Sequence, residues 1–377
     1  MPPFSQDALQ LAPAFDEQEN QFADAFAVIR QAIEQRAFPG ASLAVTHRGA
    51  LVASQGFGRF TYRQNSPAVG AETVFDLASL TKVVATTAVA MLLYQRAKLS
   101  LDQPIEKILP EFITLAPKHQ HVQRHFVTVR TLLAHSSGLP AYERLFQIAT
   151  TPKDAVRAAI ASPLIATPGT LVEYSDIGFI LLGEALARIA VEPLDAFAQR
   201  EIFAPLAMTR TCFNPPAEWK AEIPPTEDEG SSFGCVMQGE VNDENANVMG
   251  GVAGQAGVFA PATDIARFAE CVLRGGSPIL QPGTLKLFLR RETSPRGTTR
   301  ALGWDTPTRP ESSSGKLFSD RAVGHLGFTG TSLWIDPERQ LSVTLLTNRT
   351  WPDRTSNAIR EVRPQVHDAI VEALNET

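Results

Sequence analysis

Ser79-Leu80-Thr81-Lys82 opens an apolar run over residues 79–97 that has the period of a helix. Residues three apart lie on one face of a helix, so the lysine amine can approach the serine hydroxyl. The N-terminus of such a helix offers partial positive charge to a developing oxyanion. Serine is a weak nucleophile until a base takes its proton, and a partly desolvated neutral lysine can be that base. The tetrapeptide therefore predicts a nucleophile, Ser79, beside its base, Lys82.

This pattern alone has little specificity, because chance gives about one S-x-x-K match in a chain of this length. Ser313-Ser314-Gly315-Lys316 also matches, in a Ser/Gly loop where nothing fixes the geometry. Two later motifs favour the first match. Tyr174-Ser175-Asp176 precedes a helical run, and His325-Leu326-Gly327 leads into a predicted strand over 331–336.

The two ends of the chain predict a shared sheet. Apolar positions three and four residues apart predict a helix over 16–36, and a similar stripe predicts a closing helix over 356–374. Short β-rich runs bounded by turn residues predict strands. These strands are expected at 41–46, 51–55, 331–336 and 341–347.

We therefore expect an α+β fold, an α/β sandwich in which an antiparallel sheet is flanked by N- and C-terminal helices. Residues 1–78 and 262–377 are expected to form this domain, and residues 79–261 an inserted, mainly helical domain. The insert includes a long irregular loop over 214–250 that is rich in Pro, Glu, Asp and Gly.

Composition excludes several classes of protein. The 377 residues carry a net charge of −6, which argues against a nucleic-acid binder, and 44% hydrophobic residues suffice for a sizeable core. Cys212, Cys235 and Cys271 are too scattered for a disulfide framework, so we expect reduced thiols. The longest apolar stretch, 83–94, is shorter than the roughly twenty residues that cross a bilayer, so no membrane span is expected. The first twenty residues lack the pattern of a secretory signal, which predicts a cytoplasmic protein.

The ordered set Ser79-x-x-Lys82, Tyr174-x-Asp176 and His325-x-Gly327 resembles the serine β-lactamase and penicillin-binding protein superfamily. It is most similar to the branch of class C enzymes, D-aminopeptidases and family VIII carboxylesterases, whose motifs are S-x-x-K, Y-x-N and K/H-T-G. The likeness covers most of residues 25–350. Four supporting stretches are similar too: residues 75–78, 101–104, 132–139 and 330–337.

By position, the resemblance implies a role for each residue. Ser79 would form the acyl-enzyme, Lys82 would accept its proton, and Tyr174 would shuttle a proton between nucleophile, leaving group and water. The backbone N–H groups of Ser79 and Phe328 would form the oxyanion hole, usually the largest contribution to acyl transfer. The substrate-binding residues would be Asp176, His325 and Gly327. No cofactor and no metal are implied.

Two departures from the family motifs affect the substrate and the base. Asp176 stands where the family has Asn, so a carboxylate beside Lys82 would favour protonated lysine and shift the burden of base onto Tyr174. Leu326 replaces the Thr whose hydroxyl helps to bind a substrate carboxylate, and His325 replaces the commoner Lys. Efficient β-lactam turnover is therefore not expected. If the imidazole faces the cleft, we expect kcat/KM to show a His325 titration near pH 6–7.

Three other readings compete. Gly230-Ser231-Ser232-Phe233-Gly234 matches the G-x-S-x-G elbow of α/β-hydrolases, but an acidic proline loop precedes it instead of a strand. His119, His121 and His125 could ligate zinc in a metal-dependent hydrolase, although no acidic residue stands beside them in the sequence. A non-catalytic binder of peptides or cell-wall fragments is the third reading, and it has no need of a paired nucleophile and base. Residues 243–245 and 250–254 resemble a family loop near the mouth of the site.

The sequence thus predicts a serine hydrolase that acts through an acyl-enzyme in a cleft between the two domains. Its expected substrates are small esters, or D-amino acid amides and peptides, with a β-lactamase or DD-carboxypeptidase as the alternative. Its partners are expected to be small molecules, and neither nucleic acid nor membrane.

Overall fold

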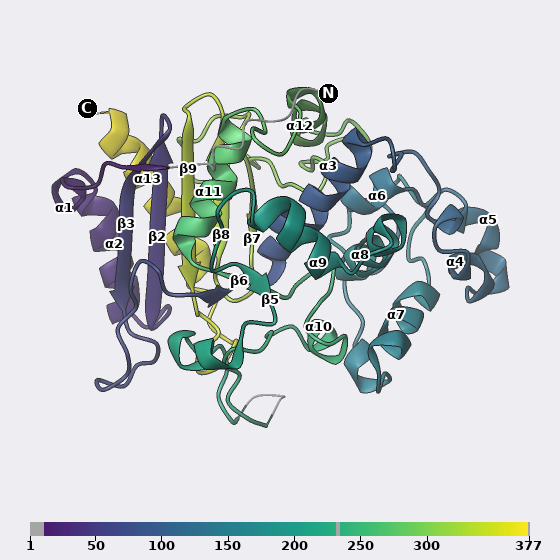
Figure 1. Cartoon of the computed structure of the whole chain (residues 1–377), viewed down its shortest axis with the longest axis horizontal. Coiled ribbons are helices and arrows are strands. Elements are labelled where there is room, and N and C mark those ends of the chain that lie inside the picture. Colours follow the sequence, from purple (N-terminus) through teal and green to yellow (C-terminus); the bar gives the residue numbers. More distant parts are fainter. Residues whose placement is uncertain (1–10, 231–233, 376–377) are drawn as a thin grey trace.

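A six-stranded sheet forms one side of the molecule (Figure 1). The computed structural model describes residues 11–230 and 234–375. The strands lie in the order β1-β3-β2-β9-β8-β7, so both ends of the chain contribute to one sheet, as the sequence predicted. Their bounds are Ala12–Pro13 (β1), Ala50–Gly58 (β3), Gly40–His47 (β2), Leu341–Thr347 (β9), Ser332–Asp336 (β8) and Val323–Leu326 (β7). Because β1 pairs with β3 in parallel, the sheet is mixed and not wholly antiparallel.

Alternation along the strands decides which helices cover each face of the sheet. In β2, Leu43 and Val45 belong to one buried cluster and Ala44 to another, as expected for side chains that alternate across a strand. The first cluster packs against α2 (Ala23–Glu34) and α13 (Ile359–Asn375). The second face is covered by α11, Ala262–Leu273 (Figure 1). The expected sheet flanked by terminal helices is confirmed.

A second, three-stranded sheet was not predicted. It consists of β4 (Phe75–Asp76), β6 (Val258–Ala260) and β5 (Cys212–Phe213), in the order β4-β6-β5. These strands are too short to produce an alternating pattern in the sequence. The small sheet matters because β4 leads directly into the segment that carries Ser79.

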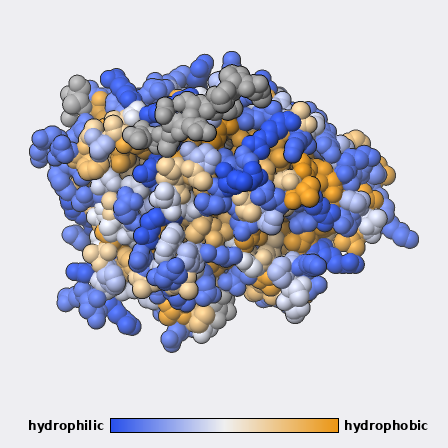
Figure 2. Space-filling view, viewed as in Figure 1, coloured by the Kyte–Doolittle hydropathy of each residue, from blue (hydrophilic) through white to orange (hydrophobic). Residues whose placement is uncertain are grey.

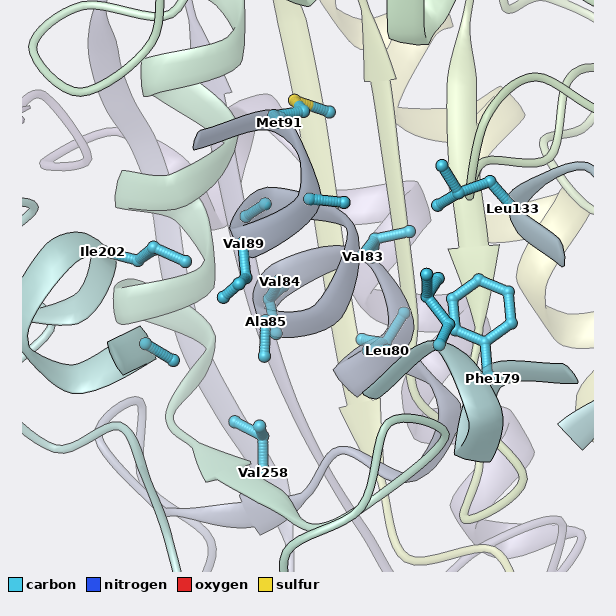
Figure 3. Close-up of a cluster of buried hydrophobic side chains, with 14 of the residues drawn as sticks. Leu80, Val83, Val84, Ala85, Val89, Met91, Leu133, Phe179, Ile202 and Val258 are labelled. Atoms are coloured by element: carbon cyan, nitrogen blue, oxygen red, sulfur yellow. The ribbon is translucent and has the colours of Figure 1, made fainter. Parts of the chain in front are cut away.

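The other side of the molecule is mainly helical and packs around the segment that follows Ser79. This segment begins as a 3-10 turn (η1, Ala78–Leu80), continues as a π-helix (η2, Lys82–Thr87) and ends as α3 (Ala88–Gln95), where the sequence predicted one regular helix. Figure 3 shows the buried side chains around it. They include Leu80, Val83, Val84, Ala85, Val89, Met91, Leu133, Phe179, Ile202 and Val258.

The remaining helices are short, apart from one long helix that follows Tyr174. The α-helices are α1 (Gln18–Gln21), α4 (Glu111–Thr114), α5 (His121–Arg124), α6 (Val129–Leu133), α7 (Pro152–Ala161), α8 (Asp176–Ala190), α9 (Leu194–Ala198), α10 (Glu244–Val248) and α12 (Pro282–Leu289). The 3-10 turns are η3 (Ile105–Lys107), η4 (Lys118–Gln120), η5 (Leu145–Gln147) and η7 (Ala217–Glu222), and η6 (Gln199–Phe203) is a second π-helix. The predicted irregular segment 214–250 therefore contains η7 and α10.

Several expectations can be compared with this arrangement. Cys212, Cys235 and Cys271 are free, as expected. Across the described residues, no helix combines the length and apolarity needed to span a bilayer. Figure 2 shows small apolar groups separated by polar side chains on the face that it presents. The division into two domains at residues 78/79 and 261/262 stays a prediction. Of the twenty residues on which the expectation about a secretory signal depends, the first ten lie outside the described part.

Candidate functional site

Ser79 lies in a tight turn that the surrounding chain holds in a strained conformation. Ala78, the residue before it, has φ +46°, which is uncommon for a residue with a side chain. The buried Asp76 carboxylate fixes this turn: Oδ1 accepts from the Ala78 N–H at 2.8 Å and Oδ2 from the Asn242 N–H at 2.7 Å. The sequence signal for this arrangement was the stretch Phe75-Asp76-Leu77-Ala78.

Lys82 occupies the position that its spacing predicted. Its side chain is 0% exposed, and Nζ donates to Ser79 Oγ at 2.9 Å and to the Gln255 carbonyl at 3.1 Å. Nζ also lies 2.6 Å from Asp176 Oδ1, in an ion pair whose carboxylate side chain is 19% exposed. The expected carboxylate beside the lysine is therefore present.

These contacts determine the resting charges of the site. Burial disfavours the charged form of Lys82, but the Asp176 carboxylate and Tyr174 outweigh it, and the pKa of Lys82 is raised. Burial also raises the pKa of Tyr174, against the opposing effect of Lys82. At neutral pH the free enzyme thus holds an ammonium at Lys82 and a neutral hydroxyl at Tyr174. A preformed tyrosinate is not available as the base.

Tyr174 lies just before α8, and its ring packs against the ring of His135. His135 was not predicted as a site residue. The two rings are 4.6 Å apart between centroids, and His135 Nδ1 accepts from the N–H of Ser175 at 2.9 Å. Ser175 then caps α8, because its Oγ accepts from the Gly178 N–H at 2.9 Å. Burial lowers the pKa of His135 well below its usual value, so its ring is a neutral support. The signal was present in the family-like stretch over 132–139.

The turn after β7 is tied to the segment that carries Ser79. Thr329 Oγ1 donates to the Asp76 carbonyl at 2.8 Å, and Thr331 Oγ1 donates to the Leu77 carbonyl at 2.9 Å. Gly327 is needed between them, since a Cβ there would meet Thr331 Oγ1 at 1.9 Å and the Leu77 carbonyl at 2.5 Å. These bonds bring the backbone of residues 327–328 to the Ser79 turn. Neither the Ser79 N–H nor the Phe328 N–H donates to another backbone group in the described part of the chain.

The predicted site residues meet at one cleft of about 1910 Å³. The cleft is lined by Ser79, Tyr174, Asp176, His325, Gly327 and Phe328, among others. Lys82 does not line the cleft: it is buried and contacts it through Ser79 and Asp176. The structure therefore brings together side chains from three separate parts of the sequence, around residues 79, 174 and 325.

His325 differs from what the sequence suggested. It is 3% exposed, Nδ1 donates to the Leu326 carbonyl at 2.8 Å, and the buried Nε2 has no hydrogen-bond partner in the described residues. Burial, with the charges of Lys82 and Arg300, lowers the pKa of His325 well below its usual value. The expected His325 titration near pH 6–7 is therefore wrong, because the low-dielectric site and two cations oppose protonation. The ring stays neutral and leaves a lone pair at Nε2.

The loop over 243–245 forms part of the cleft wall, as its resemblance suggested. Asp243 Oδ1 accepts from the Ala246 N–H at 2.7 Å and from Gln255 Nε2 at 3.1 Å. Burial and the neighbouring Asp176 carboxylate raise the pKa of Asp243 to about 6. Sequence reasoning missed Gln255, whose carbonyl reaches Lys82, because a backbone acceptor leaves no motif.

The competing sites find little support. Ser231 to Phe233 of the G-x-S-x-G match lie outside the described residues. Ring nitrogens of His121 and His125 contact the Ala116 carbonyl and Glu106, so the acidic neighbour absent from the local sequence is supplied by another segment. In the described ranges, no group of three or more His, Cys, Asp or Glu side chains is arranged to hold a metal ion. In the second S-x-x-K match, the Ser313 carbonyl accepts from His367 and the Lys316 N–H donates to Asp368.

Known proteins are similar to this chain in sequence and in fold. The sequence model of the Beta-lactamase family matches residues 25–365. "N-acetylmuramyl-L-alanine amidase" of Bacillus subtilis (strain 168) is 32% identical over 346 residues, which are 83% of this chain and 77% of the relative. "Putative D-alanyl-D-alanine carboxypeptidase" of Escherichia coli (strain K12) is 32% identical over 314 residues, which are 74% of this chain and 69% of the relative.

Among solved structures, "EstCE1, a hydrolase with promiscuous acyltransferase activity" has a TM-score of 0.76 at 22% identity and covers 94% of this chain and 100% of its own. At this identity the likeness concerns the fold. The family model, in contrast, matches most of the sequence and includes all three motif regions. The chain belongs to the Beta-lactamase family of serine hydrolases.

Proposed function

We propose that Ser79 attacks an ester or amide carbonyl and forms an acyl-enzyme that water then hydrolyses. The observation that carries this proposal is the 2.9 Å contact between Nζ of the fully buried Lys82 and Oγ of Ser79, which lines the cleft. The N–H groups of Ser79 and Phe328 are the oxyanion donors in this proposal, supported by the bonds that hold residues 327–331 to the Ser79 turn.

The proton of Ser79 passes to Lys82 in its neutral form. Asp176 opposes this step, because it stabilises the ammonium in the free enzyme, and activity should rise toward alkaline pH. Tyr174 keeps its proton at rest and donates it to the leaving group as the tetrahedral intermediate collapses. It then takes back a proton from the Lys82 ammonium, which lies beside its ring and returns to the neutral form. This assignment gives the base to Lys82 and the relay to Tyr174.

The residues at the end of strand β7, beside Ser79, favour neutral acyl groups over carboxylates. Leu326 offers no hydroxyl, and the neutral His325 offers no positive charge to an anion. Two cations of the cleft wall already have carboxylate partners: Arg300 lies 3.7 Å from Asp305, and Arg354 is paired with Glu227 and Glu244. Small esters, then D-amino acid amides and peptides, are the proposed substrates.

Covalent labelling tests the chemistry. A fluorophosphonate should modify Ser79 in the native protein, as mapped by mass spectrometry, and Ser79→Ala should abolish both labelling and turnover. Lys82→Ala should slow acylation by several orders of magnitude, because nucleophile and base act as a unit. Labelling at Ser313 would contradict the assignment. A folded protein that neither labels nor turns over any ester would favour the non-catalytic binder.

A substrate panel tests the class. Short-chain p-nitrophenyl esters should have a higher kcat/KM than a chromogenic cephalosporin or a penicillin, since the substrate carboxylate loses a hydrogen bond of about 1–3 kcal/mol. Leu326→Thr should improve cephalosporin hydrolysis relative to ester hydrolysis. Leu326→Val should not, because valine has the shape of threonine but lacks the hydroxyl. Equal gains in both variants would show that size, and not the hydroxyl, controls the choice.

The β-lactamase and DD-carboxypeptidase activities stay the second candidates, supported by a relative named for D-alanyl-D-alanine carboxypeptidase. The panel decides between them and an esterase. The cytoplasmic location expected from the sequence is also kept as a proposal, which fractionation of cells that produce the protein would test.

A further inference from the structure

A buried arginine contacts the peptide group that carries the second proposed oxyanion donor. The N–H of Phe328 and the carbonyl of Gly327 belong to one peptide plane. Arg363, in the second turn of α13, donates from Nη2 to the Gly327 carbonyl at 3.0 Å and to the Thr331 carbonyl at 2.8 Å. The Gly330 N–H also donates to the Gly327 carbonyl, at 3.1 Å. The carbonyl end of the peptide thus receives two donors, one of them charged.

This arginine is unusual in its surroundings. Arg363 is 5% exposed, and within residues 11–230 and 234–375 no carboxylate forms an ion pair with it. Burial, with the charges of Arg349 and Arg360, lowers the pKa of Arg363 to about 9, which still leaves the guanidinium protonated at neutral pH. A buried cation without a counter-ion is costly to the fold. A neutral side chain could tie the turn at lower cost, so the charge itself calls for an explanation.

The charge acts on the peptide through its carbonyl. A charge-assisted hydrogen bond to C=O is stronger than a neutral one, and hydrogen bonds in a chain polarise each other. Electron density drawn toward the Gly327 oxygen leaves the Phe328 N–H more positive. The same bond, with the Gly330 bond, fixes the plane in which this N–H points. Both effects favour an oxyanion in the cleft over a neutral carbonyl.

We infer that Arg363 is a positioning residue of the oxyanion hole: it orients the Gly327–Phe328 peptide and strengthens the Phe328 N–H as a donor. This inference rests on the proposed function, which places Phe328 in the oxyanion hole. Arg363 itself touches no reacting atom.

Arg349 provides a matched control. Its Nε donates at 2.7 Å to the carbonyl of Phe328, and its guanidinium lies 4.6 Å from the Phe328 ring. It is therefore bound to the same turn, but it acts on the next peptide, whose N–H belongs to Thr329. If Arg363 merely holds the turn in place, Arg363→Gln and Arg349→Gln should affect the site alike.

Nuclear magnetic resonance can detect the polarisation without substrate. The sequence has three Gly-Phe pairs, which end at Phe57, Phe179 and Phe328, so a protein labelled with ¹³C-carbonyl glycine and ¹⁵N phenylalanine gives three linked signals. Arg363→Gln should move the Phe328 ¹⁵N signal upfield and leave the other two in place. Arg363→Lys, which keeps the charge, should restore part of the shift and covers the case in which Arg363→Gln does not fold. An unchanged Phe328 signal in both variants would overturn the inference.

Kinetics and infrared spectroscopy then test the consequence. Loss of one oxyanion donor costs about 10²–10³ in kcat, so a weakened donor should cost about 10–100-fold in Arg363→Gln, with KM little changed. The carbonyl stretch of the Ser79 acyl-enzyme, formed from a slow ester, should move to higher frequency. Arg349→Gln should show a smaller loss and an unmoved stretch.

The two proposals fail in different ways. A wild-type protein without a Ser79 ester would overturn the proposed function, and this inference with it. A normal Ser79 ester whose stretch is the same in wild type and Arg363→Gln would overturn the inference alone. Equal losses in the Arg363 and Arg349 variants would do the same, because they would assign both residues to holding the turn.

Discussion

Replacement of Asp176 by asparagine, the residue that the family motif has at this position, removes the charge that holds Lys82 protonated. Asparagine keeps the size of the side chain and an oxygen that can accept from Nζ. The variant should therefore keep the geometry of the site and change its electrostatics. If Lys82 is the base, more of it becomes neutral at a given pH, and acylation becomes faster under neutral and mildly acidic conditions.

The magnitude follows from the ion pair. At 2.6 Å the Coulomb attraction at an effective dielectric constant of about 20 is roughly 6 kcal/mol. Neighbouring opposite charges in proteins change the free energy of ionisation by about 1.4–4 kcal/mol. This is less than the Coulomb energy, because water and other groups compensate part of the attraction. Asp176 is 19% exposed, so the smaller range applies. The neutral fraction of Lys82 should rise about ten- to a thousand-fold wherever the ammonium dominates in the wild type.

The assay is the pH profile of kcat/KM for a p-nitrophenyl ester over about pH 5–10, which reports groups of the free enzyme. The acidic limb of Asp176→Asn should move to lower pH, and the plateau should stay close to that of wild type. Asp243→Asn is the control, since Asp243 lies in the same cleft wall but bonds to Ala246 and Gln255 and not to Lys82. Its limb should move far less.

One result would refute this reasoning. If Asp176→Asn lowers kcat/KM by orders of magnitude at every pH, with an unmoved limb, the carboxylate takes part in proton transfer and Lys82 is not the independent base. Tyr174→Phe then decides the assignment. Retention of the limb in Tyr174→Phe assigns the titration to Lys82, and its disappearance assigns it to Tyr174.

Three further predictions concern the rate of catalysis, the pH dependence of stability and the need for a metal. Gly327→Ala should reduce kcat at least about 10²-fold, because its Cβ would push residues 327–331 away from the Ser79 turn, whereas Gly283→Ala, with open space around the Cβ, should leave kcat and the melting temperature close to wild type. Burial raises the pKa of Asp76 to about 6, so the native state binds more protons than the unfolded state between about pH 4 and 6. As the pH rises through this interval, the free energy of unfolding of the wild type should fall by up to about 3 kcal/mol relative to Asp76→Asn, as measured by urea unfolding. Dialysis against a strong chelator should leave ester hydrolysis intact; a loss that zinc restores would favour a metal-dependent hydrolase.

Much of the fold could be predicted because side chains alternate between the two faces of a strand, so a buried face leaves an alternating apolar pattern in the sequence. The strand at 341–347 was predicted with its observed bounds, and the strand predicted at 41–46 is one residue shorter at each end than β2. In both strands, apolar side chains on one face pack on helices, and this face gives the sequence its alternating pattern. The strand β7, which carries His325, was not predicted as a strand separate from the one at 331–336. Its four residues include Gly324 and a histidine, and its partners lie in β8 and near Asp305, so pairing and not local preference makes it a strand.

The candidate site shows the same division. The sequence by itself indicated the candidate residues, because helix geometry explains the S-x-x-K spacing and the two later motifs resemble those of a known family. It also indicated that a carboxylate would stand beside Lys82. Only the tertiary structure decided the charge states, since a pKa depends on burial and on charges that arrive from distant segments.

His325 illustrates this most clearly, for nothing in its own neighbourhood of the sequence says that Lys82 and Arg300 will surround it and keep it neutral. The residues that hold the site in place could not be predicted from the sequence for a related reason. The Gln255 carbonyl beneath Lys82 and the Arg363 guanidinium on the Gly327 carbonyl act through the backbone, and any residue type has a backbone. Local patterns record which side chains a segment needs. The chain must fold before long-range contacts decide what those side chains can do.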